Sequence, residues 1–174
     1  VPYKVFVSTL PGNLSRASLY SASALGQSSA NWALRAFASE VDVITYEFEN
    51  IPTAALDALE ALRPIHPNRM ALATAQDRIV EKTFLQGLGL NVAPFAAVNS
   101  LADLQAALAK IGTPAILKTT RLGYDGKGQV RINAADEAEP AWTAMANAPS
   151  VLEGFVNFER EISVLIRRDQ EDDS

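Results

Sequence analysis

PAILKTTRLGYDGKGQVRIN, residues 114–133, is the stretch of this chain that says most about its fold. Its two ends are rich in apolar and β-branched residues and predict two short strands, and the loop between them has three glycines within six residues. Glycine leaves main-chain N–H groups unobstructed and permits a positive φ, so such a loop can wrap an anionic phosphate. Lys118, at the end of the first strand, would add a positive charge there. An ordinary glycine hairpin fits the same pattern.

The loop matches neither of the two commonest nucleotide-binding signatures. It lacks the spacing G-x-x-x-x-G-K-[ST], and a strand follows it, whereas a helix follows the motif G-x-G-x-x-G. A glycine loop between two strands is instead the arrangement of a flexible lid over phosphates. The candidate phosphate-binding residues are Lys118, Gly123, Tyr124, Asp125, Gly126, Lys127, Gly128 and Gln129.

The composition narrows the classes of function. With 174 residues, 48% apolar and 20% charged, the chain is an ordinary globular protein that can bury a core. A net charge of −5 without a basic cluster argues against nucleic acid as a main partner, and no apolar run is long enough to span a membrane. Cysteine is absent and His66 is the single histidine, which excludes disulfides and Cys- or His-rich metal sites. The first apolar run is too short for a signal peptide, so we expect a cytoplasmic protein.

The first half of the chain predicts alternating strands and helices. Residues 41–46 indicate a buried strand, Thr53 is placed to cap a helix over 54–63, and residues 69–88 are expected to be mainly helical. Arg78 lies near the start of the segment QDRIVEK, where it either reaches a phosphate or faces solvent. The residues expected to point inward from this stretch are Ile79, Phe84, Leu85 and Leu88.

The second half predicts strands around a helix and the glycine loop. A strand at 94–98 precedes a helix that Ser100 and Asp103 begin as a capping-box-like pair. The last two strand candidates are VLEGFV (151–156) and REISVLIRR (160–168).

This order of elements predicts an α/β fold in which an N-terminal parallel-sheet domain is followed by a partial α+β unit. We expect an incomplete substrate domain over residues 1–75, a lid-bearing subdomain over 76–150, and the start of a larger subdomain over 151–174. No element follows the last strand to cover its apolar face, so we expect a truncated domain.

Four glutamates are candidate ligand-binding residues. Glu47 and Glu49 follow the first strand, where open α/β sheets bind ligands, and they share one face if the strand continues through them. They can hold an amine or ribose hydroxyls, or simply form a solvated strand end. Glu153 and Glu161 each lie beside a terminal strand. A carboxylate there can accept two ribose hydroxyls, or pair with a neighbouring arginine on the surface.

Four segments, in this order, resemble the ATP-grasp enzymes of purine biosynthesis. Within them the likeness is to the carboxyaminoimidazole ribonucleotide synthases, the ATPase subunit of phosphoribosylaminoimidazole carboxylase. The segments are TYEFENIP (45–52), QDRIVEKTFL (76–85), ILKTTRLGYDGKGQ (116–129) and VLEGFVNFEREISV (151–164). The combination of GYDGKGQ, TYEFEN and E-x-F-V-x-F-x-x-E is specific. The resemblance covers residues 41–168 well and 1–40 loosely.

The resemblance implies a pre-ATP-grasp substrate domain followed by the two-part ATP-grasp fold, with its lid at residues 123–129. The implied ATP contacts are Arg78, Lys118, the lid, the hinge residues Glu153, Gly154, Phe155 and Val156, and Glu161. The hinge would recognise adenine through main-chain groups, and Glu161 would bind ribose. Tyr124 and Asp125 would also face aminoimidazole ribonucleotide and serve in catalysis. Of Glu47 and Glu49, the former is the better match for a contact with that substrate.

The reaction implied by the resemblance is an ATP-dependent carboxylation. ATP would phosphorylate bicarbonate to carboxyphosphate, which delivers carbon dioxide to the amine of aminoimidazole ribonucleotide. The family's first glycine loop has no equivalent here, since LGQSSA at 25–30 does not match it. Mg²⁺ is implied, with its ligands in a C-terminal half outside this chain, so we expect the chain alone to be inactive. A homodimer is usual for the family. Another carboxylate–amine ligase, similar to glycinamide ribonucleotide transformylase, and a non-catalytic nucleotide-binding fragment remain open.

Overall fold

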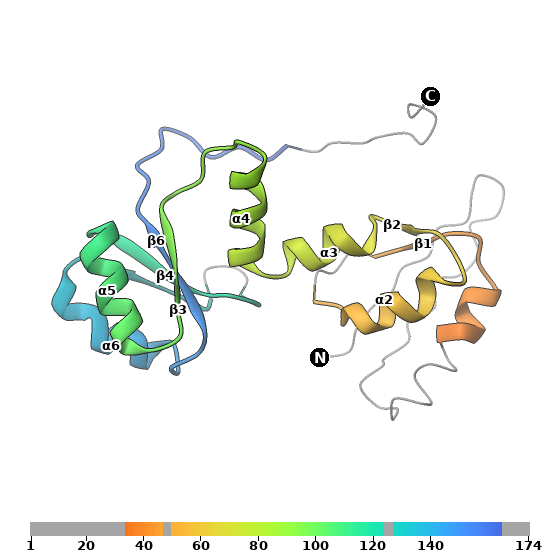
Figure 1. Cartoon of the computed structure of the whole chain (residues 1–174), viewed down its shortest axis with the longest axis horizontal. Coiled ribbons are helices and arrows are strands. Elements are labelled where there is room, and N and C mark those ends of the chain that lie inside the picture. The colour runs from red at the N-terminus through yellow and green to blue at the C-terminus, as the bar shows by residue number, and fades with distance from the viewer. Residues whose placement is uncertain (1–33, 47–49, 124–126, 165–174) are drawn as a thin grey trace.

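The computed structural model describes residues 34–46, 50–123 and 127–164, which form two units (Figure 1). The N-terminal unit contains a two-stranded sheet and the second unit a four-stranded sheet. Helix α4 (Arg78–Gly87) lies between the two units along the chain. Within the described ranges, no helix combines the length and the apolar character needed to cross a membrane.

In the N-terminal unit, β1 (Ile44–Thr45) pairs in parallel with β2 (Ile65–His66), and α2 (Thr53–Glu60) connects them. Helix α3 (Arg69–Ala75) follows and packs against α2. These elements confirm the predicted parallel sheet with its helices. The buried core of the unit consists of Leu34, Phe37, Ala38, Ile44, Ile51, Leu56, Leu59, Ile65 and Leu72.

Two local predictions for this unit are wrong in detail. The strand expected at 41–46 is confined to β1, because β2 offers only a two-residue partner. Thr53 does not cap α2 but is its first helical residue, and Pro52 occupies the N-cap position at φ −58° and ψ 125°. Proline has no side-chain oxygen to accept a hydrogen bond, so no side chain caps this helix.

The stretch predicted as mainly helical at 69–88 is two helices. The break follows Ala75, and Asp77 begins α4 as its N-cap residue. The Asp77 carboxylate accepts hydrogen bonds from the N–H groups of Ile79 at 2.9 Å and Val80 at 3.2 Å. An aspartate in this position satisfies N–H groups that have no partner within the helix and so favours a new start.

The inward orientation expected for α4 is wrong for Phe84 and Leu88, which are 45% and 62% exposed. Ile79 and Leu85 are half-buried, and α4 contributes no buried residue to either core. Helical spacing identifies an apolar face but not the element that covers it. Among the described residues, α4 makes its main helix contact with α3.

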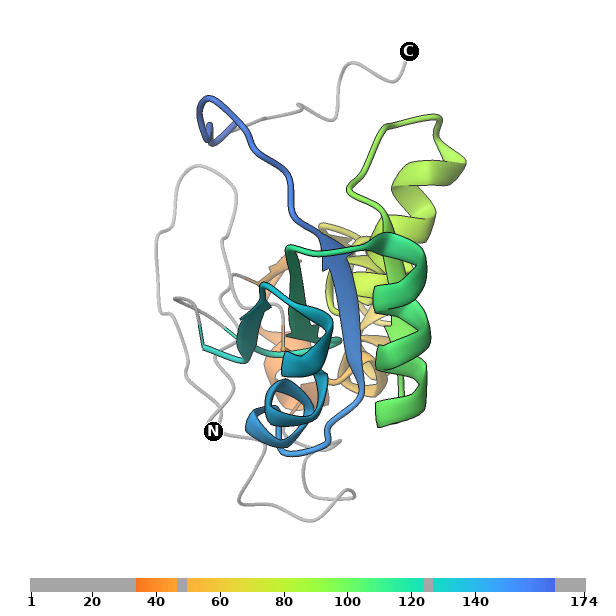
Figure 2. The same ribbon diagram turned by 90° about the vertical axis from the view of Figure 1, so that its left-hand side faces the viewer.

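The second unit is an antiparallel sheet with helices on one face (Figure 2). In spatial order its strands are β3 (Phe95–Val98), β6 (Ser150–Gly154), β4 (Ala115–Thr119) and β5 (Gln129–Ile132). Helices α5 (Leu101–Ile111) and α6 (Ala138–Ala144) bury the core face, with the short 3-10 turn η2 (Ala135–Glu137) before α6. The fully buried core residues here include Val98, Leu104, Ala115, Leu117, Ile132 and Leu152. The expected α+β architecture is thereby confirmed.

The start of α5 agrees with the predicted capping pair. Ser100 Oγ accepts a hydrogen bond from the N–H of Asp103 at 3.1 Å, and Asp103 Oδ2 accepts one from the N–H of Asn99 at 3.0 Å. Gly112 follows the helix at φ 89°, a conformation that favours glycine. Ser100 and Gly112 therefore mark the two ends of α5.

The second terminal strand, predicted at 160–168, is wrong for residues 160–164. These residues form no strand, and Ile162 and Val164 are 73% and 70% exposed. A strand persists through hydrogen bonds to a neighbour, and no described strand pairs with this segment. Residues 165–168 lie outside the described part of the chain.

Candidate functional site

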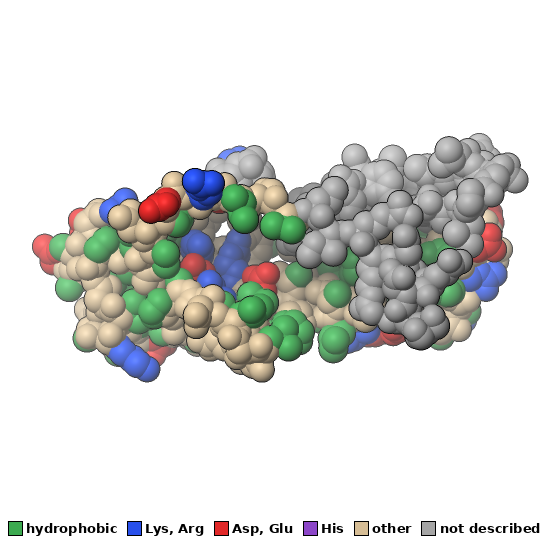
Figure 3. Space-filling model, turned by 90° about the horizontal axis from the view of Figure 1, so that it is seen from above, with side chains coloured by type: hydrophobic (Ala, Val, Ile, Leu, Met, Phe, Trp, Pro, Cys, Tyr) green, Lys and Arg blue, Asp and Glu red, His purple; other side chains and the backbone are tan. Residues whose placement is uncertain are grey.

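The face of the four-stranded sheet opposite α5 and α6 carries the charged side chains. β4 and β6 are neighbours, with Ile116 paired to Glu153, and Lys118 lies two residues further along β4 on the same face. Glu153 is only 7% exposed. Figure 3 shows basic and acidic side chains gathered in a hollow of this unit.

Glu153 is held between two lysines. Its Oε2 accepts a hydrogen bond from Lys118 Nζ at 3.0 Å, and its Oε1 lies 3.2 Å from Lys82 Nζ. The side chains of all three residues are largely buried. A buried carboxylate needs such partners, and one carboxylate between two ammonium groups leaves a net charge of +1. The alternative of a surface pair with an arginine is therefore wrong for Glu153.

Lys82 was not among the residues that the sequence suggested for this site. It projects from α4, and its Nζ lies 5.9 Å from the centre of the Phe95 ring on β3. The sequence held one signal for it, the four-residue spacing from Arg78, which places both side chains on one side of a helix. That signal gives no indication of the contact with Glu153.

The predicted glycine loop joins β4 to β5 in an antiparallel hairpin, as expected. The N–H of Thr119 donates to the carbonyl of Gly128 at 3.0 Å and closes the base of the loop. Gly123 has φ +88°, and a Cβ there would lie 2.7 Å from the carbonyl oxygen of Lys127, so no side chain fits. Tyr124, Asp125 and Gly126 lie outside the described residues.

Arg78 holds the base of this loop through main-chain carbonyls. Its guanidinium donates to the carbonyls of Thr119 (2.7 Å), Leu122 (2.7 Å) and Gly123 (3.4 Å). The main-chain N–H of Arg78 also donates to the carbonyl of Thr120 at 2.9 Å. Arg78 is therefore not a solvated helix side chain, and its contact with a phosphate stays a prediction.

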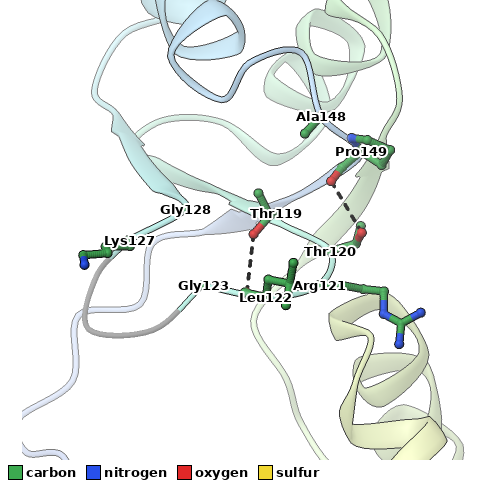
Figure 4. Close-up of a pocket in the computed structure, with 9 residues that line it drawn as sticks. All are labelled: Thr119, Thr120, Arg121, Leu122, Gly123, Lys127, Gly128, Ala148 and Pro149. Atoms are coloured by element: carbon green, nitrogen blue, oxygen red, sulfur yellow. Dashed lines mark hydrogen bonds between the residues drawn. The ribbon is translucent and has the colours of Figure 1, made fainter. Parts of the chain in front are cut away.

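Two pockets adjoin the loop. The larger, of about 430 Å³, is shown in Figure 4 and is bounded by the end of β4, the described loop residues and the turn at Ala148 and Pro149. The smaller, of about 140 Å³, lies between the units. It is lined by Asn50, Ala75, Gln76, Arg78, Glu81, Leu122 and Gly123. The loop thus separates one pocket within the second unit from another that both units line.

The predicted hinge at 153–156 leaves the sheet in a defined conformation. The N–H of Gly154 donates to the carbonyl of Pro94 at 2.8 Å, and the N–H of Phe155 donates to the carbonyl of Pro114 at 3.1 Å. The Arg131 guanidinium lies 4.3 Å from the centre of the Phe155 ring, a cation–π contact. Phe155 and Val156 are themselves 39% and 48% exposed, so their outer faces are open to a ligand.

The remaining predicted residues are not brought into this group. Glu161 lies in the exposed segment after β6, and Glu47 and Glu49 lie outside the described residues. Over residues 34–46, 50–123 and 127–164, no three His, Cys, Asp or Glu side chains are placed to hold a metal ion. A Mg²⁺ ion bound with ATP uses one or two carboxylates together with phosphate oxygens, so its site needs no such cluster, and the carboxylates that the resemblance implies for it stay a prediction.

Comparison with known protein families agrees with the two units. Residues 3–76 match the ribonucleotide synthetase preATP-grasp domain, and residues 83–174 match the ATP-grasp domain. The two matches follow the order of the parallel and antiparallel sheets.

Individual relatives agree with this assignment. The chain is 49% identical over 140 residues to an N5-carboxyaminoimidazole ribonucleotide synthase of Brucella melitensis, covering 79% of this chain and 39% of that protein. A crystal structure of the ADP complex of an N5-carboxyaminoimidazole ribonucleotide synthetase is similar at a TM-score of 0.70 and 37% identity, over 81% of this chain and 36% of the other. The Aspergillus clavatus enzyme with ADP and aminoimidazole ribonucleotide gives 0.66 and 27%, over 74% and 34%. The chain spans less than half the length of these relatives.

Proposed function

Because the chain belongs to the ATP-grasp family, which matches more than half of it, we propose that it acts in the ATP-dependent carboxylation of aminoimidazole ribonucleotide. The observation that carries the proposal is the placement of Lys82 and Lys118 around Glu153. These residues lie beside a hairpin whose glycines leave the main chain unobstructed by side chains. The relatives named for this reaction, and their complexes with ADP, support it.

In this proposal, the lysines and the loop bind the phosphates of ATP. The two ammonium groups supply positive charge, while main-chain N–H groups of the 123–129 loop supply hydrogen-bond donors. Arg78 stabilises the base of the loop by donating hydrogen bonds to the carbonyls of Thr119, Leu122 and Gly123. A loop held at its base and free of side chains at Gly123 is suited to lie close over a phosphate.

The hinge at 153–156 is proposed to bind the adenine. The N–H groups of Gly154 and Phe155 are used within the fold, so recognition falls to the remaining main-chain groups of the segment. The exposed faces of Phe155 and Val156 supply apolar contact for a flat ring. Glu161 is proposed to accept the ribose hydroxyls once the segment after β6 closes on the nucleotide.

The second substrate is proposed to bind where the two units meet. Asn50, Arg78 and Gln76 line the pocket of about 140 Å³ there. Glu47, Glu49, Tyr124 and Asp125 are assigned to aminoimidazole ribonucleotide on their match to the family's motifs alone. Their roles are proposals, as are the domain limits at residues 75 and 150.

The chemistry proposed is phosphorylation of bicarbonate by ATP, followed by transfer of carbon dioxide from carboxyphosphate to the amine of aminoimidazole ribonucleotide. Positive charge from the lysines stabilises the phosphoryl group during transfer, and a closed lid excludes the water that would hydrolyse carboxyphosphate. Mg²⁺ would neutralise charge on the phosphates of ATP. Since the reaction consumes ATP, we expect the protein to act in the cytoplasm. A homodimer is proposed on the family resemblance alone.

The proposal is tested by measuring ADP release from ATP by the complete protein, with each partner substrate alone and with both together. We expect release that requires both bicarbonate and aminoimidazole ribonucleotide. Release with formate and glycinamide ribonucleotide would instead identify the related carboxylate–amine ligase. ADP binding without turnover in either mixture would identify a non-catalytic nucleotide-binding protein.

Tyr124→Phe and Asp125→Asn extend the test to the two proposed catalytic residues. Each should lower turnover in the complete protein without lowering the melting temperature. The neighbouring glycines supply the backbone conformations that the turn needs, so these two side chains are not required for it. A parallel loss of turnover and melting temperature would assign them to folding of the loop instead.

A further inference from the structure

Gln76 is a buried polar residue between the two units. It follows α3, is 6% exposed, and is one of three buried polar or charged residues in the described ranges, with Ser150 and Glu153. Glu153 is engaged by the lysines, and Ser150 Oγ donates to the carbonyl of Ala148 at 2.8 Å. Gln76 differs from both because its partners belong to separate units.

The two ends of the Gln76 amide make different bonds. Nε2 donates to the carbonyl of Ile51 at 2.5 Å, and Oε1 accepts a hydrogen bond from Nη2 of Arg121. Ile51 is 2% exposed and belongs to the core of the N-terminal unit. Arg121 follows β4 and begins the glycine loop. One side chain therefore joins the core of the first unit to the base of the loop.

Residues 76–78, which we call the connector, join α3 to α4 and make a second contact with the loop. Two residues after Gln76, Arg78 donates to the carbonyls of Thr119, Leu122 and Gly123. A shift of the N-terminal unit that moves the Ile51 carbonyl must therefore displace the connector or lose the buried hydrogen bond. Leaving that carbonyl unpaired in the interior is unfavourable, so the alternative is movement of the loop base.

The pocket between the units lies at this bridge. Asn50, which precedes Ile51, lines it together with Gln76, Arg78 and Gly123. A ligand in the pocket contacts the N-terminal unit, the connector and the loop at once. Its binding energy can thus depend on the position of the loop, which is the condition for coupling between two sites.

We propose that Gln76 is a positioning residue that couples the pocket between the units to the nucleotide-binding loop. It acts through Arg121 and the Ile51 carbonyl rather than by touching the reacting atoms. This inference rests on the proposed function, since it takes ADP as the ligand of the loop and aminoimidazole ribonucleotide as the ligand of the pocket. Coupling of this kind is reciprocal, so each ligand should raise the affinity for the other by the same factor.

The test measures ADP affinity by calorimetry, with and without saturating aminoimidazole ribonucleotide, in the complete protein. In the wild type we expect the second ligand to tighten ADP binding about fivefold or more. Gln76→Met keeps the side-chain length but removes both bonds, and should reduce this factor to near one. Gln86→Met, on the exposed side of α4, is the matched control and should leave the factor unchanged.

Arg121→Met breaks the same bridge from its exposed end and serves if Gln76→Met does not fold. It should also abolish the coupling. A purely structural role would lower the melting temperature of these variants and leave the coupling factor at the wild-type value, which would overturn the inference. Independent binding of the two ligands to the wild type would overturn it as well. If the wild type binds neither ligand, the proposed function itself is wrong.

Discussion

In the second unit, β4 is paired along its length with both β5 and β6, whereas in the N-terminal unit β1 and β2 pair over two residues only. The register of the larger sheet fixes which face each side chain occupies, so Lys118 and Glu153 meet on one side while Leu117 is buried on the other. The N-terminal unit contributes differently, through a main-chain carbonyl and the wall of a pocket. Where pairing is extensive, side chains can be aimed at a ligand. Where it is short, the backbone and the connector make the contact.

The largest effect is expected from the same substitution made once in each unit. Leu117 and Leu56 are both fully buried, so Leu117→Ala and Leu56→Ala should each lower the free energy of unfolding by about 2–5 kcal/mol. Leu117→Ala should also weaken ADP binding, because Leu117 adjoins Lys118 in β4. Denaturant unfolding and calorimetry on the complete protein measure the two effects. Equal weakening of ADP binding by Leu56→Ala would show that the sheet of the second unit does not set the site alone.

The second largest effect is expected from the loss of Lys118, which the register of β4 and β6 places on the same face of the sheet as Glu153. Lys118→Met should weaken nucleotide binding by about 1–3 kcal/mol, because it removes the charged hydrogen bond that Lys118 is proposed to make with a phosphate. Lys110→Met provides the control, since Lys110 is an exposed lysine near the end of α5. Calorimetric titration with ADP separates the two variants. An unchanged affinity for Lys118→Met would remove this lysine from the nucleotide site.

A smaller effect is expected at the loop itself. Gly123→Ala places a Cβ 2.7 Å from a main-chain oxygen at φ +88° and should cost about 1–2 kcal/mol of stability. Gly87→Ala, at the end of α4, meets nothing within 4 Å and should be neutral or slightly stabilising. Thermal unfolding of the pair distinguishes a constrained glycine from a tolerant one. A loss at Gly87 as large as that at Gly123 would contradict this assignment.

The smallest effect is expected on the surface of the N-terminal unit. Asp57 accepts a hydrogen bond from Arg69, and this bond and the nearby negative charge raise the pKa of the Arg69 guanidinium. The arginine keeps its charge at every pH used for such proteins, but both partners are exposed and screened by salt, so the pair should contribute little to stability. We expect Asp57→Asn to leave the unfolding midpoint unchanged at both low and high salt. A shift at low salt alone would show that the exposed pair contributes after all.

Local patterns in the sequence were sufficient for most elements of the second unit, but not for the strand expected at 160–168, which residues 160–164 do not form. The strand and glycine signals around residues 114–133 predicted the hairpin, because a turn and its flanking strands depend on neighbours in the chain. The pair Ser100 and Asp103 likewise predicted the start of α5. Periodicity did less well for α4, where Phe84 and Leu88 turned out to be exposed, since an apolar stripe does not specify what covers it.

The contacts that assemble the site could not be predicted from local patterns. Lys118 and Glu153 are 35 residues apart in sequence, and Gln76 and Arg121 are 45 apart. Such pairs arise from the order of strands in the sheet and from the packing of the connector. The spacing of residues along the chain does not predict them. The sequence therefore identified Lys118 and Glu153 as separate candidates, and missed that Lys82 joins them.

The carboxylate between Lys82 and Lys118 has a consequence for the ionic-strength dependence of binding. Two unaccompanied ammonium groups would attract phosphate strongly at a distance and lose most of that attraction as salt rises. Because Glu153 is paired with both lysines, the electrostatic field of the three groups at a distance is that of a single positive charge. Each lysine still has N–H donors that can bond to a phosphate once it is within hydrogen-bond distance. Capture of an anion at this site should therefore depend weakly on salt, and its selectivity should come from close fit rather than from long-range attraction.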